Sequence, residues 1–460
     1  MTSETAVYPA TDTTDADTGK HFMGHPRGLG YIIFTEAWER FSFYGMQGLL
    51  ILYMSGYLLQ PENAVNVWGF AGFKSVLESI FGQLSAQALS AQIFGLYVGL
   101  VYFLPVFGGL LGDRYLGRTR AVVFGAILMA IGHFLMAFES LFLLALLSLI
   151  LGSGFLKGNL AAQVGGLYSK DDKRRDSAYS LYAVAINVGA FIAPLVCGSL
   201  GELVGWHYGF GAAGVGMLVG MGIYLRGLKY MPAETVRESE EEKPKLQPGD
   251  GRILFSLVSV MVISTFFWIA QTQIWNTYPL WIKARVDREL LDWQVPVTWF
   301  QSMDTLAVLI LAPFVLWFWR RQSKRQREPN DLGKIIAGCL VFGGACSILA
   351  LSEVFSQGTE PALIEIWWPA LFHLVAGIGY LYTSPITLSL VSRSAPVAVN
   401  AMMVGCYYLA IFAGGIISGW LGRFYEILPS SSFWFMHAAL VAGAGLLIWM
   451  LRSPLQKRLP

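Results

Sequence analysis

The sequence predicts an all-α membrane protein in which twelve transmembrane helices form two bundles of six. The first observation is composition: the 460 residues are 55% hydrophobic and 13% charged, with a mean hydropathy of +0.53, whereas soluble domains carry about 25% charged residues. The second is a succession of twelve apolar segments, each long enough for a helix to cross a roughly 30 Å hydrocarbon layer. The third is a polar run midway along the chain, which divides the segments six and six.

The twelve segments follow one another in order along the chain. They lie near residues 28–57, 88–114, 118–138, 140–167, 174–200 and 205–230, and then near 251–283, 294–322, 331–354, 363–393, 396–424 and 429–452. Several exceed 25 residues, so these helices are expected to tilt or to extend beyond the bilayer. The predicted units are a tail at 1–27, a bundle at 28–230, a linker at 231–250, a bundle at 251–452 and a tail at 453–460.

Basic residues are distributed unevenly between the two sets of loops. One set holds most of them, in groups near 114–120, 170–175, 226–252 and 320–327, and the other set holds few. Because loops rich in Lys and Arg stay on the cytoplasmic side, both termini are predicted to be cytoplasmic. The N-terminal tail has no apolar core, so no signal peptide is predicted. The expected location is a bacterial inner membrane.

Several classes of function are disfavoured by the sequence. The formal net charge of +2 gives no basic excess of the kind that binds nucleic acid. The four cysteines lie in apolar segments at spacings that fit no metal site. The chain contains neither H-E-x-x-H nor G-x-S-x-G, and no glycine-rich phosphate loop, which argues against an enzyme and against ATP drive. No cofactor is expected, the bilayer is the expected surrounding, and a monomer is predicted.

The first apolar segment contains charged residues that a membrane helix ordinarily excludes. A charge at the bilayer centre costs about 2.5–3.5 kcal/mol and normally faces a cavity or a partner. Glu36 and Arg40 are four residues apart and stack on one helical face, which Tyr44 and Gln47 continue, while Glu39 lies one step away. Such a polar stripe on an apolar helix predicts a face toward an aqueous cavity.

A further intramembrane cation, Lys157, lies near the middle of the fourth segment. It requires a carboxylate, and Glu36 and Glu39 are the nearest plausible ones. Two crowded acids share few cations, so one of them is expected to take up a proton near neutral pH. The sequence does not decide which one. The alternative is a neutral ion-pair cluster that only holds two helices together.

Two other features carry alternatives. The stretch G-G-L-L-G-D-R-Y-L-G-R at 108–118 predicts a gating turn in which Asp113, Arg114 and Arg118 pair with one another and with a neighbouring helix end; the alternative is a solvated basic turn. The intramembrane residues His133 and His373 are expected to be hydrogen-bonded core groups, with a proton relay as the alternative.

Several motifs resemble one known family. E-A-W-E-R-F-S-F-Y-G at 36–45 resembles the E-x-x-E-R-F-x-Y-Y-G signature of the proton-dependent oligopeptide transporters, a branch of the major facilitators. G-S-G-F-L-K-G-N-L at 152–160 and Y-A-V-A-I-N-V-G-A-F at 182–191 resemble that family's fourth- and fifth-helix motifs. The resemblance implies the major facilitator fold and symport of di- and tripeptides with protons by alternating access.

The resemblance also implies roles for individual residues. Proton coupling falls to Glu36, Glu39 and Arg40, together with Lys157, which pairs with them and helps to hold the peptide carboxylate. The other implied peptide-binding positions are Arg40, Tyr44, Tyr102 and Asn187 in the first half and Trp268 and Ser384 in the second.

Four departures from the family pattern bear on binding. Gln47 stands where the family usually has arginine, and Tyr380 where it has the glutamate that receives the peptide amino group. Residues 271–273 lack a glutamate often found there, whereas Asp304 replaces the usual asparagine. We hypothesise that Asp304 has taken over the amino-group role, the alternative being a local cap or pair. These departures keep open a carrier of nitrate, a drug or a modified peptide on the same scaffold.

Overall fold

The computed structural model describes residues 22–169, 171–232, 245–356 and 363–459. Most of the predicted N-terminal tail (residues 1–21) and of the predicted linker (residues 233–244) lies outside these ranges. The long helices are α1 Arg27–Tyr53, α4 Ala86–Leu111, α5 Arg118–Leu135, α6 Phe142–Gly166, α7 Arg174–Ala193, α8 Trp206–Gly227, α9 Asp250–Gln273, α11 Val297–Lys324, α12 Asp331–Ser356, α13 Trp367–Ser394, α14 Asn400–Gly422 and α15 Ser430–Met450. The short elements are α2 Pro61–Ala64, α3 Phe70–Phe81, α10 Thr277–Arg285, β1 Glu289–Leu290, β2 Trp293–Gln294 and α16 Arg452–Gln456.

The predicted all-α membrane fold is confirmed. Within the described ranges, eleven helical stretches are long and apolar enough to cross a membrane. The remaining long helix is α1, whose Glu36, Glu39 and Arg40 lower its hydropathy although it is 27 residues long. At 1.5 Å per residue such a helix spans about 40 Å, which is enough to cross the hydrocarbon layer.

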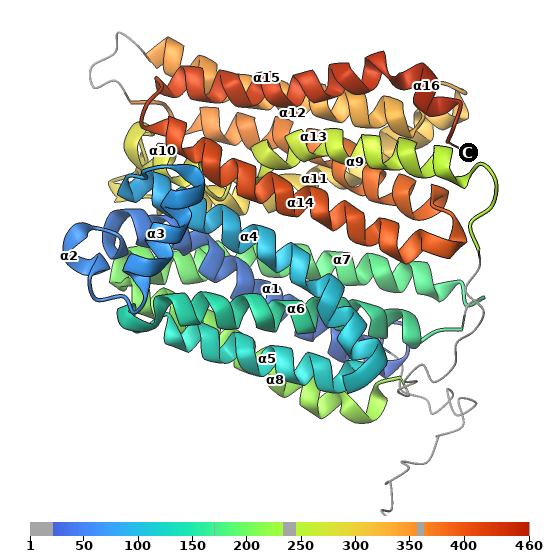
Figure 1. Cartoon of the computed structure of the whole chain (residues 1–460), viewed down its shortest axis with the longest axis horizontal. Helices are drawn as coiled ribbons and strands as arrows, with labels where there is room; N and C mark the ends of the chain where they lie inside the picture. Colours follow the sequence, from blue (N-terminus) through green and yellow to red (C-terminus); the bar gives the residue numbers. More distant parts are fainter. Residues whose placement is uncertain (1–21, 170, 233–244, 357–362, 460) are drawn as a thin grey trace, which may run out of the picture.

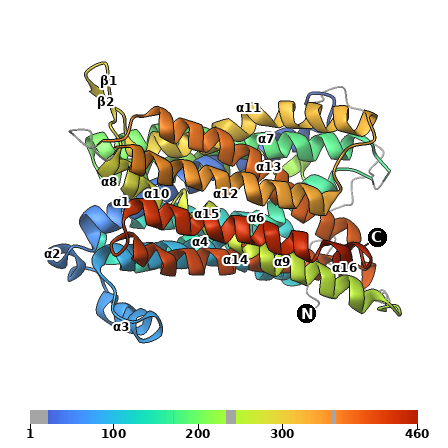
Figure 2. The same cartoon turned by 90° about the horizontal axis from the view of Figure 1, so that it is seen from above.

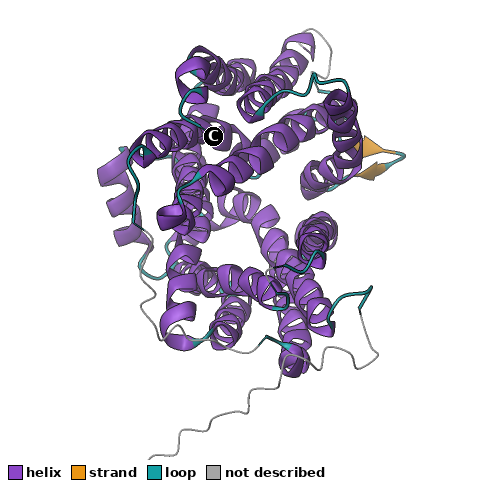
Figure 3. Cartoon of the chain, turned by 90° about the vertical axis from the view of Figure 1, so that its right-hand side faces the viewer, coloured by secondary structure: helices purple, strands orange, loops and turns teal. Residues whose placement is uncertain are grey.

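The helices form two groups that lie side by side (Figures 1 and 3). In the first group α1 packs against α7 and α8, and α6 packs against α4 and α5. In the second, α12 packs against α13 and α15, while α9 packs against α14 and α15. The groups meet where α4 contacts α14 and where α7 contacts α11. At the α4–α14 contact a side chain on Gly95 would lie 2.3 Å from the Gly415 carbonyl oxygen, so this close approach requires glycine.

The seventh predicted segment is broken rather than continuous. Helix α9 ends at Gln273, and α10 begins at Thr277 after a bend whose last residue, Asn276, has φ −101° and ψ −92°. Discontinuous helices at membrane depth are typical of carrier binding sites, because the freed backbone lines protein or water rather than lipid. The bend places Trp275 beside α1, as described below.

One end of the molecule carries α2, α3 and the β1–β2 hairpin, and the other carries α16 (Figure 2). We call these the hairpin end and the α16 end; the distribution of basic residues predicts that the hairpin end faces outward. Hydrogen bonds join the two bundles at the hairpin end. Arg423 donates to the carbonyls of Phe81 and Gln83 at 2.7 and 3.3 Å, and the Trp299 indole donates to Ser199 Oγ at 2.8 Å.

Three further hydrogen bonds between the bundles are made by Glu202, which follows α7. Its carboxylate accepts the backbone N–H of Val297 at 2.8 Å and the N–H and hydroxyl of Thr298 at 2.9 and 2.8 Å. A residue of the first bundle thus caps the first turn of α11 in the second bundle, where the helix dipole favours a negative charge. Opening the hairpin end requires these three bonds to break.

We therefore expect Glu202→Gln to open the hairpin end. The amide keeps an acceptor but loses the charge, and hydrogen bonds to charged groups are worth about 1.5–3 kcal/mol. Spin labels at the exposed positions Leu203 and Leu291, in a background without the native cysteines, should show a larger population of long distances. Glu62→Gln, at an exposed carboxylate in α2, is the matched control. An unchanged distance distribution in Glu202→Gln would show that the cap does not hold this end closed.

Candidate functional site

Three charged side chains of α1 form a compact buried cluster. Arg40 Nε lies 2.7 Å from Glu36 Oε1 and 2.7 Å from Glu39 Oε2. Both glutamates are fully buried and Arg40 is 7% exposed. The spacing read from the sequence brings Glu36 and Arg40 together as predicted, because residues four apart share a helical face. One guanidinium therefore serves two carboxylates.

The two carboxylates differ in how well they are hydrogen-bonded. Glu36 accepts from Arg40 Nε through one oxygen and from the Tyr182 hydroxyl, at 2.6 Å, through the other. Glu39 lies within ion-pair distance of Arg40, but neither of its oxygens accepts a well-directed hydrogen bond from any described residue. A single Nε–H points along one line, so it serves Glu36 at the expense of Glu39. Glu39 is therefore the less stabilised anion.

Lys157 stands beside this cluster without joining it. Its Nζ lies 3.8 Å from the centre of the Phe43 ring and 5.1 Å from that of Tyr102. Among the described residues Nζ has no hydrogen-bond partner, so the expected pairing with a glutamate is not formed in this conformation. The physical reason is that Arg40 already provides a counter-charge within 2.7 Å of each carboxylate. The ammonium group rests on an aromatic face, where the attraction is weaker than an ion pair, and it remains available for another anion.

A cluster of three aromatic side chains, Tyr44, Tyr102 and Trp275, connects the two bundles next to Lys157. The Tyr44 ring lies 5.1 Å from the Trp275 ring, and the Tyr44 and Tyr102 side chains are hydrogen-bonded. Trp275 comes from the bend between α9 and α10, so a side chain of the second bundle packs directly on α1. Trp275 was not among the predicted site residues, because a break inside an apolar run carries no clear signal in composition.

Asp304 of α11 contacts the Trp275 end of this cluster. It is 9% exposed, and its side chain accepts a hydrogen bond from Trp275 and one from Gln271 Nε2 at 3.4 Å. A third neighbour is His373, whose Nδ1 lies 4.0 Å from Asp304 Oδ1. A chain of contacts through Tyr102, Tyr44 and Trp275 therefore connects Lys157 with Asp304.

The other predicted binding residues are distributed unevenly. Trp268 contacts the rings of Tyr380 and Tyr407 at 6.5 and 6.2 Å, and Ser384 Oγ lies 3.1 Å from the Tyr407 hydroxyl, so Trp268, Tyr380 and Ser384 share one locus. Gln47 is buried and its amide oxygen has no partner among the described residues. Asn187 instead donates to the Ala183 carbonyl of its own helix at 2.8 Å.

The predicted gating turn lies at the α16 end. Asp113 Oδ1 accepts from Arg118 Nε at 2.7 Å, and both side chains are well exposed. Nearby Asn159 of α6 donates to the Gly108 carbonyl of α4 at 3.0 Å, which holds the turn against its neighbour. Arg114 lies in the same turn. The predicted pairing of Asp113 with Arg118 is present, and a gating role for the three residues stays a prediction.

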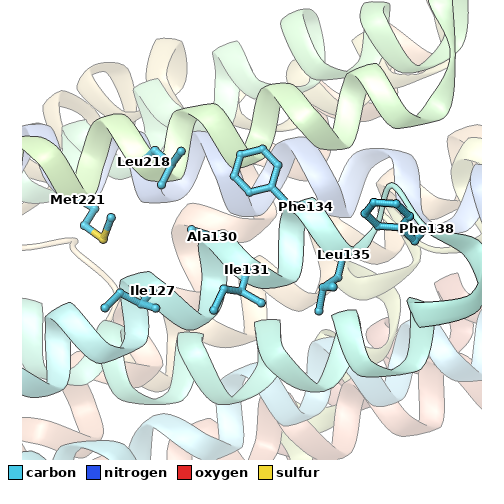
Figure 4. A pocket seen from close by; sticks show the side chains of 8 residues that line it. All are labelled: Ile127, Ala130, Ile131, Phe134, Leu135, Phe138, Leu218 and Met221. Atoms are coloured by element: carbon cyan, nitrogen blue, oxygen red, sulfur yellow. The ribbon is translucent and has the colours of Figure 1, made fainter.

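A separate groove lies between α5 and α8 and has a volume of about 340 Å³ (Figure 4). Its lining is apolar and consists of Ile127, Ala130, Ile131, Phe134, Leu135, Phe138, Leu218 and Met221. Such a lining offers no hydrogen bond or counter-charge to a polar solute, whose burial would then be costly. The groove is not a candidate for the solute site.

Comparison with known proteins identifies the family. The sequence matches the Major Facilitator Superfamily over residues 63–419. It is 30% identical over 481 residues to the peptide transporter YePEPT of Yersinia enterocolitica, an alignment that covers 89% of this chain and 90% of that protein. The chain belongs to the proton-dependent oligopeptide transporter family of the major facilitators.

Two further relatives of this transporter support the assignment. It is 27% identical to the di-/tripeptide transporter of Lactococcus lactis subsp. cremoris, over 96% of this chain and 98% of that protein. The crystal structure of peptide transporter POT in complex with sulfate superposes with a TM-score of 0.83 at 26% identity and covers 98% of this chain and 100% of that one. The protein is thus an integral membrane transporter and not an enzyme.

Proposed function

We propose that this transporter carries di- and tripeptides together with protons by alternating access across a bacterial inner membrane, with both termini cytoplasmic. The observation that carries the proposal is the placement of opposite charges in the two bundles. Lys157 and Arg40 supply cations from the first bundle and Asp304 supplies a carboxylate from the second, with aromatic side chains between them.

This arrangement is complementary to a zwitterion. A peptide has a carboxylate and an ammonium group, and each needs a counter-charge when it leaves water. In the proposal the peptide carboxylate binds Lys157, whose Nζ has no hydrogen-bond partner among the described residues. The ammonium group binds Asp304, and the hydroxyls of Tyr44 and Tyr102 face the peptide backbone. Related transporters named for peptides, from Yersinia and Lactococcus, support peptides as the cargo.

Proton coupling in this proposal takes place at Glu39. Its carboxylate accepts no well-directed hydrogen bond from the described residues, whereas Glu36 has two donors. Lys157 interacts electrostatically with both glutamates. Protonation of Glu39 therefore leaves Arg40 and Lys157 with one neutralising carboxylate, that of Glu36, in place of two. The remaining net positive charge attracts the peptide carboxylate. Binding of proton and peptide is therefore reciprocal.

The first experiment is uptake of labelled dialanine into proteoliposomes, with and without an inward acid gradient. The proposal expects accumulation with the gradient and equilibration without it. Parallel counterflow assays with nitrate, a drug and a modified peptide test the alternative cargo. Counterflow of one of these without counterflow of dialanine would refute peptide transport.

Asp304→Asn tests the amino-group site. The amide cannot neutralise an ammonium group, and hydrogen bonds to charged groups are worth about 1.5–3 kcal/mol, so the Michaelis constant for dialanine should rise about 10- to 100-fold. For N-acetyl-dialanine, which has no ammonium group, it should change little. Equal effects on both compounds would assign Asp304 a structural role.

A further inference from the structure

A buried histidine lies behind Asp304 and is not used by the mechanism above. His373 of α13 is 1% exposed. Its Nε2 lies 2.9 Å from the hydroxyl of Tyr278 in α10, and its Nδ1 faces Asp304 Oδ1 at 4.0 Å without a hydrogen-bond partner among the described residues. Helices α10, α13 and α11 thus bring a tyrosine, a histidine and a carboxylate into successive contact, with the histidine in the middle.

The order of these atoms favours a proton between His373 and Asp304. A bare Nδ1 and a carboxylate oxygen would present lone pairs to each other, so a hydrogen on one of them is favoured. The Tyr278 hydroxyl can donate to Nε2 or accept from it. By reorienting its hydroxyl, Tyr278 therefore accommodates His373 both before and after the ring gains a second proton. A shortening of the 4.0 Å gap by about 1 Å would complete the hydrogen bond.

Within the described residues, the neighbours of Asp304 other than His373 are uncharged hydrogen-bond donors and tyrosines. From α9 and the bend that follows it, Gln271 and Trp275 donate to Asp304. Two tyrosines, Tyr278 of α10 and Tyr380 of α13, lie close enough to feel the charge of Asp304. The other charged and titratable side chains around this locus are already paired or hydrogen-bonded, namely Arg285 with Glu353 across α10 and α12, His437 of α15 with Gln273, and Tyr407 of α14 with Ser384.

We propose that Asp304, His373 and Tyr278 form a second proton-binding site, in the C-terminal bundle, whose proton competes with the ammonium group of the peptide. The inference rests on the proposed function for its substrate but not for its proton. A proton held between His373 and Asp304 neutralises the carboxylate. The ammonium group of a peptide can bind Asp304 only when that proton is absent, so the proton competes with the peptide below the pH at which the pair titrates, and the pair carries no proton when the peptide binds above that pH.

The two proton sites then act with opposite sign on the peptide. Protonation of Glu39 favours binding of the peptide carboxylate, whereas protonation of the Asp304–His373 pair opposes binding of the ammonium group. By mass action, each pH unit below the titration of the pair should raise the Michaelis constant for dialanine about tenfold relative to that for N-acetyl-dialanine. The acetylated compound keeps the carboxylate, and so the effect of Glu39, but does not use this site.

The transport test is dialanine counterflow at equal pH on both sides of the membrane, between about pH 5 and 8, where histidine ordinarily titrates. His373→Asn keeps a donor near the Nδ1 position but cannot take up a proton, so we expect the acid rise in the Michaelis constant to disappear. Tyr278→Phe should displace the rise along the pH axis. His133→Asn is the matched control, because His133 is equally buried and lacks hydrogen-bond partners among the described residues. An acid rise that persists in His373→Asn, or that appears equally with N-acetyl-dialanine, would overturn the proposal.

A second readout does not depend on the substrate. Nuclear magnetic resonance of nitrogen-15-labelled histidine in nanodiscs should show a His373 signal, assigned by its loss in His373→Asn, that changes with pH in the wild type and not in Asp304→Asn. A His373 signal that is constant in the wild type over this range would overturn the proton site, even if dialanine is transported. Conversely, a titrating signal without dialanine counterflow would refute the proposed cargo and leave the proton site in place.

Discussion

Glu39→Gln is expected to abolish proton-driven accumulation of dialanine while leaving counterflow within a few-fold of the wild type. Glutamine preserves the size of the buried side chain but cannot bind the coupling proton. For one proton per peptide, a gradient of one pH unit supports about tenfold accumulation in the wild type by mass action; the variant should equilibrate and accumulate nothing. The measurement compares uptake under an acid gradient with counterflow in the same proteoliposomes.

Glu36→Gln is the matched comparison for this prediction. The glutamine amide oxygen can still accept a hydrogen bond from Arg40. The Tyr182 hydroxyl, which donates to Glu36 at 2.6 Å, loses its charged acceptor. We expect reduced protein stability but retained accumulation, because Glu39 remains titratable. The reverse pattern, with accumulation intact in Glu39→Gln and lost in Glu36→Gln, would move the coupling proton to Glu36.

Lys157→Met should raise the Michaelis constant for dialanine about 10- to 100-fold, the equivalent of a charge-assisted hydrogen bond worth about 1.5–3 kcal/mol. Methionine retains the apolar contact with Phe43 and Tyr102 but removes the cation. The reason for the large effect is that Lys157 Nζ has no hydrogen-bond partner among the described residues that would otherwise hold it away from the peptide.

The comparison compound for Lys157→Met is dialanine amide, which lacks the carboxylate and should bind the wild type and the variant equally. Lys74→Met, at a half-exposed lysine of α3, controls for loss of a positive charge elsewhere. A similar rise for dialanine and its amide would show that Lys157 acts through the structure of the site and not through the peptide carboxylate.

The fold and the α1 cluster were predictable because their signals are local. Apolar segments report membrane helices directly, and the spacing of Glu36 and Arg40 fixes their shared face. The family signature at 36–45 adds Glu39. Each of these features depends on residues a few positions apart, which is the range over which helical geometry alone determines contact.

The rest of the site depends on contacts between distant parts of the chain. Tyr182 donates to Glu36, 146 residues earlier in the chain, and the contacts from Tyr278 to His373 to Asp304 join three helices. The break after Gln273 places Trp275 against Tyr44, although the segment reads as continuous apolar sequence. The pairing of Arg40 with both glutamates at once could not be predicted from the sequence either, and in its presence Lys157 lies on an aromatic face.

In the proposed cycle a peptide and a proton cross together because they share the charges around Lys157 and Glu39. The most direct measurement is the internal pH of proteoliposomes, read with a trapped fluorescent dye while the membrane potential is clamped. Addition of dialanine outside should acidify the interior for the wild type and leave it unchanged for Glu39→Gln. Uptake of labelled dialanine by the wild type without any internal acidification would contradict the account.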